Sequence, residues 1–170
     1  MTPIATDKTL AMRLLDGKKV AYVALCYDPD VYVSAAEVAD AIGMPHEQVF
    51  KTLVAQPDAG KPLLAVIPAG SELDLKALAQ AAGVKKVRMA TQADAERLTG
   101  LQKGGISALA LVNKGFWVIL HSSAQQFAQI GMSAGQRGVQ VVLAPADFLR
   151  VTSARLAPIA SQKHENEPLS

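Results

Sequence analysis

Hydrophobic positions along the chain switch between helical and strand-like spacing, and these switches predict alternating helices and strands. Leu10, Leu14 and Leu15 share one helical face, which predicts a helix over residues 7–16 that ends at Gly17. The β-branched stretch that follows predicts a strand over 20–26. Four further helices are predicted from a capping residue or an early proline. Ser34 with Glu37 opens a helix that ends at Gly43, and Asp74 opens one that ends at Gly83. Thr91 opens a helix that runs to Leu98, and Pro145 lies in the first turn of the last helix.

Two pairs of apolar runs are separated by short polar links, and this pattern predicts β-hairpins. Residues 48–55 and 63–67 flank a Pro-Asp-Ala-Gly turn, and residues 106–112 and 116–120 flank Asn-Lys-Gly. Further strands are predicted over 87–89 and 139–143, with a helical turn over 125–130. The whole order predicts a single α/β domain over residues 1–160, built on a mixed, largely antiparallel sheet, and a polar tail over 161–170.

One lysine interrupts the first predicted hairpin. In a strand, Val49, Lys51 and Leu53 share one face, so the ammonium of Lys51 is flanked by apolar neighbours. Burying such a charge is costly unless it is compensated. Either that face is solvated and the side chain reaches water, or Lys51 points into a pocket for an anionic or carbonyl-bearing ligand.

Composition narrows the class of protein. The 170 residues are 50% hydrophobic, with a formal net charge of +2, which permits contact with a polyanion but lacks the dense basic stripe of a dedicated nucleic-acid binder. Cys26 is the only cysteine, so an intramolecular disulfide and a cysteine-based zinc site are excluded. The three histidines are scattered, and no apolar run approaches the ~20 residues of a membrane span. We therefore expect a cytoplasmic protein.

Two glycine-containing segments add candidate chemistry. Residues 104–107 read Gly-Gly-Ile-Ser, and residues 133–138 read Ser-Ala-Gly-Gln-Arg-Gly. Paired glycines let a ligand approach the backbone closely, but either segment alone is more typical of a turn. Neither is a phosphate-binding loop of the known kinds.

Three further motifs accompany the two glycine-containing segments, namely Lys51-Thr52, Leu-Asp-Leu-Lys at 73–76 and Thr99-Gly100. In order and spacing, the five motifs resemble the YbaK/EbsC family, over about residues 10–159. These proteins are free-standing relatives of the editing domain of bacterial prolyl-tRNA synthetases. The resemblance implies a cytoplasmic trans-editing aminoacyl-tRNA deacylase, most typically for Cys-tRNA(Pro) and also Cys-tRNA(Cys), whose sheet closes toward a barrel surrounded by helices. It implies no metal or organic cofactor, and it makes mischarged tRNA the partner, with prolyl-tRNA synthetase as a candidate second partner.

The resemblance also implies roles for individual residues. Lys51 matches the family's essential lysine, which positions the terminal adenosine, and Thr52 follows it in the substrate site. Gly105 and Ser107 match the catalytic loop whose backbone approaches the aminoacyl carbonyl, as in an oxyanion hole. The remaining substrate-binding positions are Gly104, Ser133, Gly135 and Arg137. The family needs no protein nucleophile, because in its cysteine-specific branch the thiol of the substrate attacks the ester and leaves as a thiolactone.

Several positions depart from the family pattern. Ala108 replaces a proline, Gln140 stands where an acidic residue is common, and Leu25 stands where a tyrosine is common, although Tyr27 or Tyr32 could replace it in space. These departures leave open a water-mediated deacylase for another small amino acid such as alanine. A non-catalytic module that binds tRNA ends or nucleotides is the alternative from another class.

Overall fold

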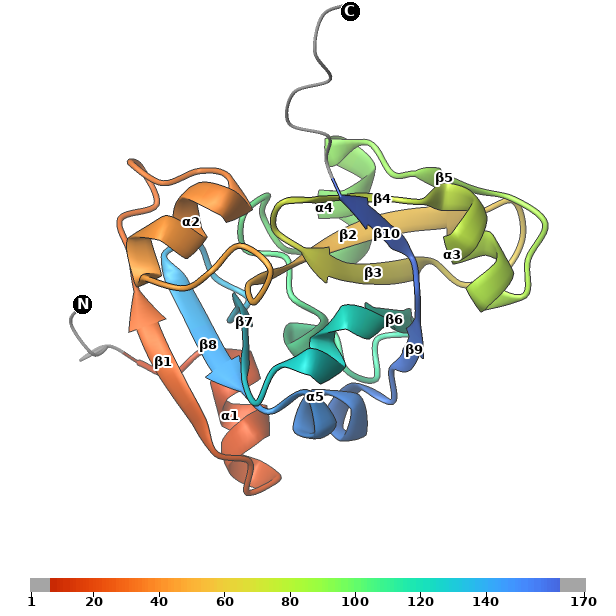
Figure 1. Ribbon diagram of the computed structural model, residues 1–170. Coiled ribbons are helices and arrows are strands. Elements are labelled where there is room, and N and C mark those ends of the chain that lie inside the picture. Colours follow the sequence, from red (N-terminus) through yellow and green to blue (C-terminus); the bar gives the residue numbers. More distant parts are fainter. Residues whose placement is uncertain (1–6, 163–170) are drawn as a thin grey trace, which may run out of the picture.

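The protein is described by a computed structural model over residues 7–162, and its strands form three sheets (Figure 1). The largest has the order β5-β2-β3-β6-β9, with β2 antiparallel to β3 and β5, and β6 parallel to β3 and β9. Its strands are β2 Phe50–Pro57, β3 Leu63–Pro68, β5 Val87–Met89, β6 Trp117–His121 and β9 Arg155–Ala157.

A smaller antiparallel sheet has the order β1-β8-β7, and a third joins β10 to β4. The bounds are β1 Tyr22–Cys26, β7 Ile130–Ser133, β8 Val139–Leu143, β4 Ser71–Leu73 and β10 Ala160–Gln162. Most strand pairs are antiparallel, as predicted. The described strands form open sheets, so the expected closure toward a barrel is not confirmed.

The helices begin where the sequence placed their capping residues. Ser34 and Glu37 form the predicted capping box, and Asp74 and Thr91 accept hydrogen bonds from the backbone of the first turn. The helices are α1 Leu10–Gly17, α2 Ala35–Ile42, α3 Leu75–Ala82, α4 Gln92–Thr99 and α5 Pro145–Thr152.

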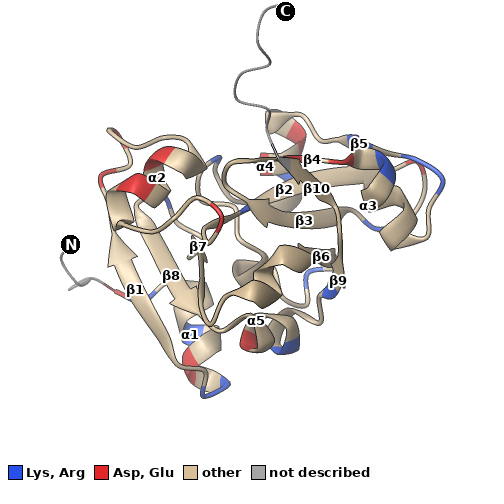
Figure 2. Cartoon of the chain, in the orientation of Figure 1, with Lys and Arg blue, Asp and Glu red and all other residues tan. Residues whose placement is uncertain are grey.

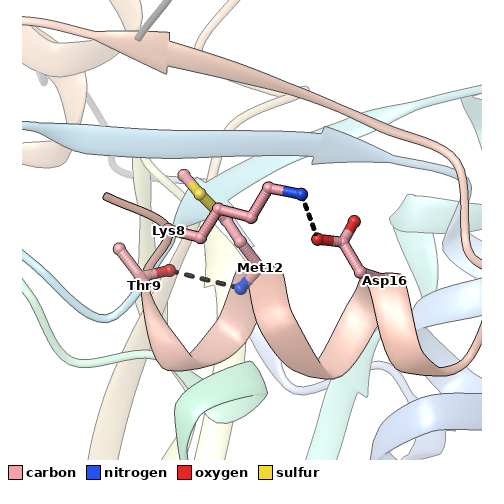
Figure 3. A network of polar contacts seen from close by, with 4 residues as sticks. All are labelled: Lys8, Thr9, Met12 and Asp16. Atoms are coloured by element: carbon pink, nitrogen blue, oxygen red, sulfur yellow. Dashed lines mark hydrogen bonds and ion pairs between the residues drawn. The ribbon is translucent and has the colours of Figure 1, made fainter. Parts of the chain in front are cut away.

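The first helix has polar contacts at both of its ends (Figure 3). Thr9 caps α1 by accepting a hydrogen bond from the Met12 N–H at 3.2 Å. Lys8 reaches Asp16 in the last turn, and this hydrogen bond holds the pKa of the Asp16 carboxyl below its usual range. Because both side chains are exposed, we expect the pair to orient the helix rather than to stabilise it strongly.

The core lies on both faces of β3, which is buried along its whole length. Leu64 and Val66 pack into one apolar cluster, while Leu63, Ala65 and Ile67 pack into another that includes α3. A strand buried on both faces is a continuous apolar run in sequence, and β3 is such a run. Strand β2, which carries Lys51, pairs along its length with this buried strand, and the pairing fixes the position of β2 in the fold.

The second predicted hairpin is wrong. Residues 106–112 form no strand; they contain a 3-10 helix, Ala108–Ala110, capped by the Ser107 hydroxyl, and β6 pairs in parallel with β3 instead. The apolar run there reflects burial, since Ala108, Leu109 and Leu111 belong to the core.

Other differences are smaller. The helical turn predicted over 125–130 is a 3-10 helix, Ser122–Gln126. Strands β4, β7, β9 and β10 were not predicted. Strand β10 includes Ser161 and Gln162, the first two residues of the predicted tail, and residues 163–170 lie outside the described residues.

The two larger sheets meet at the start of β2. Val49 forms a parallel bridge with Gly131 of β7, and the Gly131 N–H donates to the carbonyl of Gln48 at 3.0 Å. Lys51 follows Val49 by two residues, so it lies close to this junction.

Candidate active site

A cavity of about 340 Å³ lies beside the junction of the two sheets. Its walls are mainly apolar and come from segments far apart in sequence, among them Val33, Val38, Val49, Phe50, Val54 and Ile106. Pockets of this size and character commonly hold small organic ligands.

Lys51 lies in the wall of this cavity, half-buried on β2. Its Nζ donates a hydrogen bond to the carbonyl oxygen of Ala69 at 3.1 Å, which orients the side chain along the end of β3. The neighbouring Phe50 and Val54 point to the large apolar cluster, as the strand alternation predicts. Of the two alternatives for Lys51, a pocket position agrees with this placement.

Three other predicted site residues line the same cavity. They are Thr52 on β2, Gly104 before the 3-10 helix, and Ser133 at the end of β7. The Ser133 hydroxyl accepts a hydrogen bond from the Gly135 N–H at 3.1 Å, so it also shapes its own loop. Residues from both larger sheets therefore line one cavity.

Gly105 does not line the cavity; it packs against the second glycine loop. A Cβ on Gly105 would lie 3.1 Å from the Arg137 backbone nitrogen and 3.3 Å from the Gln136 carbonyl carbon. The Gly105 N–H is already bonded to the Gln102 carbonyl at 2.8 Å. This glycine therefore allows two loops to touch, and its N–H is not directed at a ligand in this structure.

Ser107 and Gly135 also lie behind the cavity wall. Ser107 is 1% exposed, and its hydroxyl accepts a hydrogen bond from the Leu109 N–H at 3.2 Å. Gly135 has φ +90°, and a Cβ there would lie 2.8 Å from the Ala110 Cβ. The structure gives both residues a role in holding the loops together.

Arg137 lines a second cavity of about 330 Å³ that shares Tyr27, Lys103 and Gly104 with the first. Its guanidinium donates to the carbonyl of Pro29 at 2.9 Å and lies 3.9 Å from Asp30. Lys103 and Tyr32 also line this cavity. Together with Arg137 and Tyr27, they give its wall two cations and two aromatic rings. The two predicted glycine loops thus border adjoining cavities.

Sequence reasoning did not assign several residues of the cavity wall. Met89, Gln92, Glu96 and Lys103 line it, although no motif singles them out. Gln140 was noted only as a departure from the family, yet it lines the cavity while 5% exposed. Leu25 lies directly across from Gln140 in the β1–β8 pair and packs on a small apolar cluster, whereas Tyr27 faces both cavities.

The lining residues offer hydroxyl, amide, carboxylate and ammonium groups but no histidine or cysteine. His46 pairs with Asp40 at 2.8 Å, and His121 accepts backbone hydrogen bonds elsewhere. Across residues 7–162, no three His, Cys, Asp or Glu side chains gather as a metal site requires. The arrangement therefore suits a reaction in which the protein positions the substrate and supplies no nucleophile of its own.

Basic and acidic residues are distributed over many elements of the chain, and α2 carries acidic residues (Figure 2). Within the described part of the chain, no helix has the length and apolarity needed to cross a bilayer.

Residues 28–151 match the model of the aminoacyl-tRNA editing domain family. The chain belongs to this family. The matched segment includes Lys51, both glycine loops and Gln140, so the cavity lies within the editing domain. Aminoacyl-tRNA editing, the deacylation of wrongly charged tRNA, is accordingly its activity.

A curated relative of this editing domain is EbsC of Enterococcus faecalis, to which a Cys-tRNA(Pro)/Cys-tRNA(Cys) deacylase activity is ascribed. The two sequences are 40% identical over 159 residues, which cover 92% of this chain and 96% of the relative. This similarity agrees with the resemblance to the YbaK/EbsC group.

Solved structures share the fold. The hypothetical protein APE2540 has a TM-score of 0.80 at 21% identity, covering 89% of this chain and 99% of its own. A protein described as a trans-editing enzyme for prolyl-tRNA synthetase has a TM-score of 0.76 at 23% identity. The match covers 92% of this chain and 99% of that protein's chain. The single-domain α/β architecture is therefore that of this structural group.

Proposed function

We propose that this editing domain acts in trans to remove cysteine from Cys-tRNA(Pro), and from Cys-tRNA(Cys), with the substrate thiol as nucleophile. The observation that carries the proposal is the meeting of Lys51, Thr52, Gly104 and Ser133 around one cavity without a histidine or cysteine of the protein. The deacylase activity ascribed to the relative that is 40% identical supports the choice of substrate.

The two adjoining cavities suit the end of a charged tRNA. The larger, mainly apolar cavity receives the terminal adenosine with its amino acid, and Lys51 holds the phosphate or ribose of that nucleotide. The second cavity, with Lys103 and Arg137 beside Tyr27 and Tyr32, receives the preceding part of the strand. Cations neutralise phosphates there, and aromatic rings offer stacking surfaces for bases.

In the proposed reaction, the cysteine sulfur attacks the carbonyl carbon of its own ester. The bond from this carbon to the ribose oxygen breaks, the thiol proton passes to that oxygen, and the products are a thiolactone and tRNA with a free ribose hydroxyl. The cavity holds sulfur and carbonyl together, so the step needs no nucleophile from the protein.

Negative charge develops on the carbonyl oxygen during the attack, and a hydrogen-bond donor stabilises it. The Gly105 N–H is bonded to Gln102, so we assign this task to Gly104, which faces the cavity. Gly105 and Ser107 then act by fixing the loop that carries Gly104.

One observation favours a second candidate, a hydrolytic deacylase for a small amino acid such as alanine. Gln140 places a neutral amide in the cavity wall, at a position where the pattern of the YbaK branch often has an acidic residue. In that reaction a bound water attacks the ester and the free amino acid leaves.

A panel of mischarged tRNAs tests both candidates. Cys-tRNA(Pro), Cys-tRNA(Cys), Ala-tRNA(Pro) and Ser-tRNA are each incubated with the protein and with Lys51→Ala, with and without prolyl-tRNA synthetase. Loss of cysteine alone, with a trapped thiolactone, supports the first candidate, and release of free alanine supports the second. Binding without any loss of amino acid would instead indicate a non-catalytic module.

A further inference from the structure

Gln140 is the one buried side-chain amide in the wall of the larger cavity among the described residues. It lies in the middle strand of its sheet, with Leu25 of β1 and Ser133 of β7 directly across from it. The side chain is 5% exposed, and its Oε1 accepts no hydrogen bond from the described residues. A polar atom in this state is normally paired in a folded protein.

The surroundings offer this oxygen little compensation. Leu25 has no donor in its side chain, and the Ser133 hydroxyl, which accepts a hydrogen bond from the Gly135 N–H, makes no hydrogen bond to this oxygen. Leaving a buried carbonyl unpaired destabilises the fold, and an apolar side chain of similar size would avoid this loss. An oxygen kept unpaired at the wall of a cavity therefore points to a ligand that supplies the donor.

We propose that Gln140 is a substrate-binding residue whose Oε1 accepts a hydrogen bond from the α-amino group of the bound aminoacyl ester. This inference rests on the proposed function, since the ligand is the aminoacyl end of tRNA. Every aminoacyl ester carries this amino group, and a charged N–H donor bonds more strongly than a neutral one. A thiol is a weak donor and would compensate the oxygen poorly.

The positions of the other charged groups agree with this assignment. Lys51 lies on β2 of the large sheet and Gln140 on β8 of the small sheet, so a substrate ammonium directed at Gln140 lies on a different wall from Lys51. Glu96 also lines the cavity, but its Oε2 accepts a hydrogen bond from the Lys103 N–H at 3.0 Å. Gln140 thus offers the more buried acceptor.

Binding of two stable analogues tests the proposal. One is a 3′-amido-adenosine that carries cysteine, and the other carries 3-mercaptopropionate, which differs only in lacking the α-amino group. Their affinities are measured by calorimetry for the wild type, Gln140→Met, Gln140→Glu and a control, Gln80→Met. Gln80 is the matched control because it is an exposed glutamine on α3 that lines neither cavity.

The wild type should bind the cysteinyl analogue more tightly than the desamino analogue. Gln140→Met should weaken the cysteinyl analogue roughly 10- to 100-fold and leave the desamino analogue unchanged, as expected for one hydrogen bond to a charged group. Gln140→Glu should keep the preference for the amino group, and Gln80→Met should bind like the wild type. Gln140→Met should also melt at the same or a higher temperature, because it removes an unpaired buried oxygen.

Equal weakening of both analogues in Gln140→Met, or no weakening, would overturn the assignment of Gln140. If the wild type deacylates tRNA normally in that case, only this inference fails. If the wild type binds neither analogue and deacylates none of the tRNAs, both the proposed function and the role of Gln140 are rejected.

Discussion

Lys51 and Ala69 are joined by a hydrogen bond from the lysine Nζ to the alanine carbonyl oxygen, 3.1 Å long. The N–H of Ala69 in turn donates to the carbonyl of Val49 at 2.8 Å. Both polar backbone groups of Ala69 are therefore bonded to β2 or to the residue just before it. This arrangement helps to hold the lysine side chain in place at the cavity.

Replacing Lys51 by alanine should reduce deacylation by at least about 100-fold, in line with the loss of one positioning or charge-stabilising group in an enzyme site. The free energy of unfolding should change by less than about 1 kcal/mol, because the side chain is only half-buried and leaves no core cavity. Single-turnover rates and urea unfolding measure the two effects. Lys85→Ala, at an exposed lysine outside both cavities, serves as the control. A Lys51→Ala variant with wild-type rates would remove Lys51 from the site.

Gly105→Ala should lower stability and activity together. The new Cβ would press on the Gln136–Arg137 backbone at 3.1 to 3.3 Å, so the two glycine loops must separate, at a cost of about 1–3 kcal/mol. A Cβ that obstructed only the substrate would instead lower the rate and leave stability unchanged. Melting curves and deacylation rates are compared with those of Gly17→Ala, since nothing lies within 4 Å of a Cβ at Gly17. A normal melting temperature combined with a lost rate would show that the Cβ obstructs the substrate and leaves the loops in place.

The parts of the fold that sequence predicted well are those set by neighbouring residues. Ser34, Asp74 and Thr91 cap helices because each side chain bonds to the backbone of the next turn. The parallel pairing of β3 with β6 joins residues more than fifty positions apart, and no local pattern encodes it. Residues 106–112 have the composition of a strand but are apolar because they are buried, so their hydrophobicity misled the prediction.

The residues of the candidate site also differ in whether the sequence alone could reveal them. Lys51 could be recognised because an ammonium inside an apolar strand is unusual, and the structure places it at a cavity. Gln140 could not be recognised, since a glutamine in a strand is ordinary until its burial and its unpaired oxygen are known. Gly105 and Ser107 were predicted on the strength of a resemblance, which gives position in the chain but not the direction in which a group points.

His121 should make the protein less stable in mild acid. Its Nδ1 accepts hydrogen bonds from the N–H groups of Ile159 and Ala160 at 3.1 and 3.2 Å, which a protonated ring could not do. Burial lowers the pKa of His121 below its ordinary value of 6.5. The unfolded chain therefore binds this proton more readily, so stability is full above about pH 6.5 and declines as the pH falls below it.

This dependence is measured by urea unfolding of the wild type and His121→Asn between about pH 7.5 and about pH 5. A single proton gives a slope of at most about 1.4 kcal/mol per pH unit, and partial exposure should keep the observed slope well below that. His121→Asn should be less dependent on pH over this range, because its side chain does not titrate. Equal slopes in the two proteins would show that other groups control the acid sensitivity.

The nucleophile can be identified by changing one atom of the substrate. If the substrate thiol attacks the ester, replacing cysteine by serine on the same tRNA should slow deacylation by orders of magnitude, because a hydroxyl at neutral pH is far less nucleophilic than a thiol that is partly ionised. The cysteine reaction should release a thiolactone that a trapping reagent captures before hydrolysis, while Ala-tRNA(Pro), which lacks any internal nucleophile, should remain charged. The lining of the cavity favours this outcome because it contains no histidine, the side chain that most often activates water. Rapid release of free alanine with little action on Cys-tRNA(Pro) would instead make water the nucleophile, and the neutral Gln140 would then be the first residue to examine as its hydrogen-bond partner.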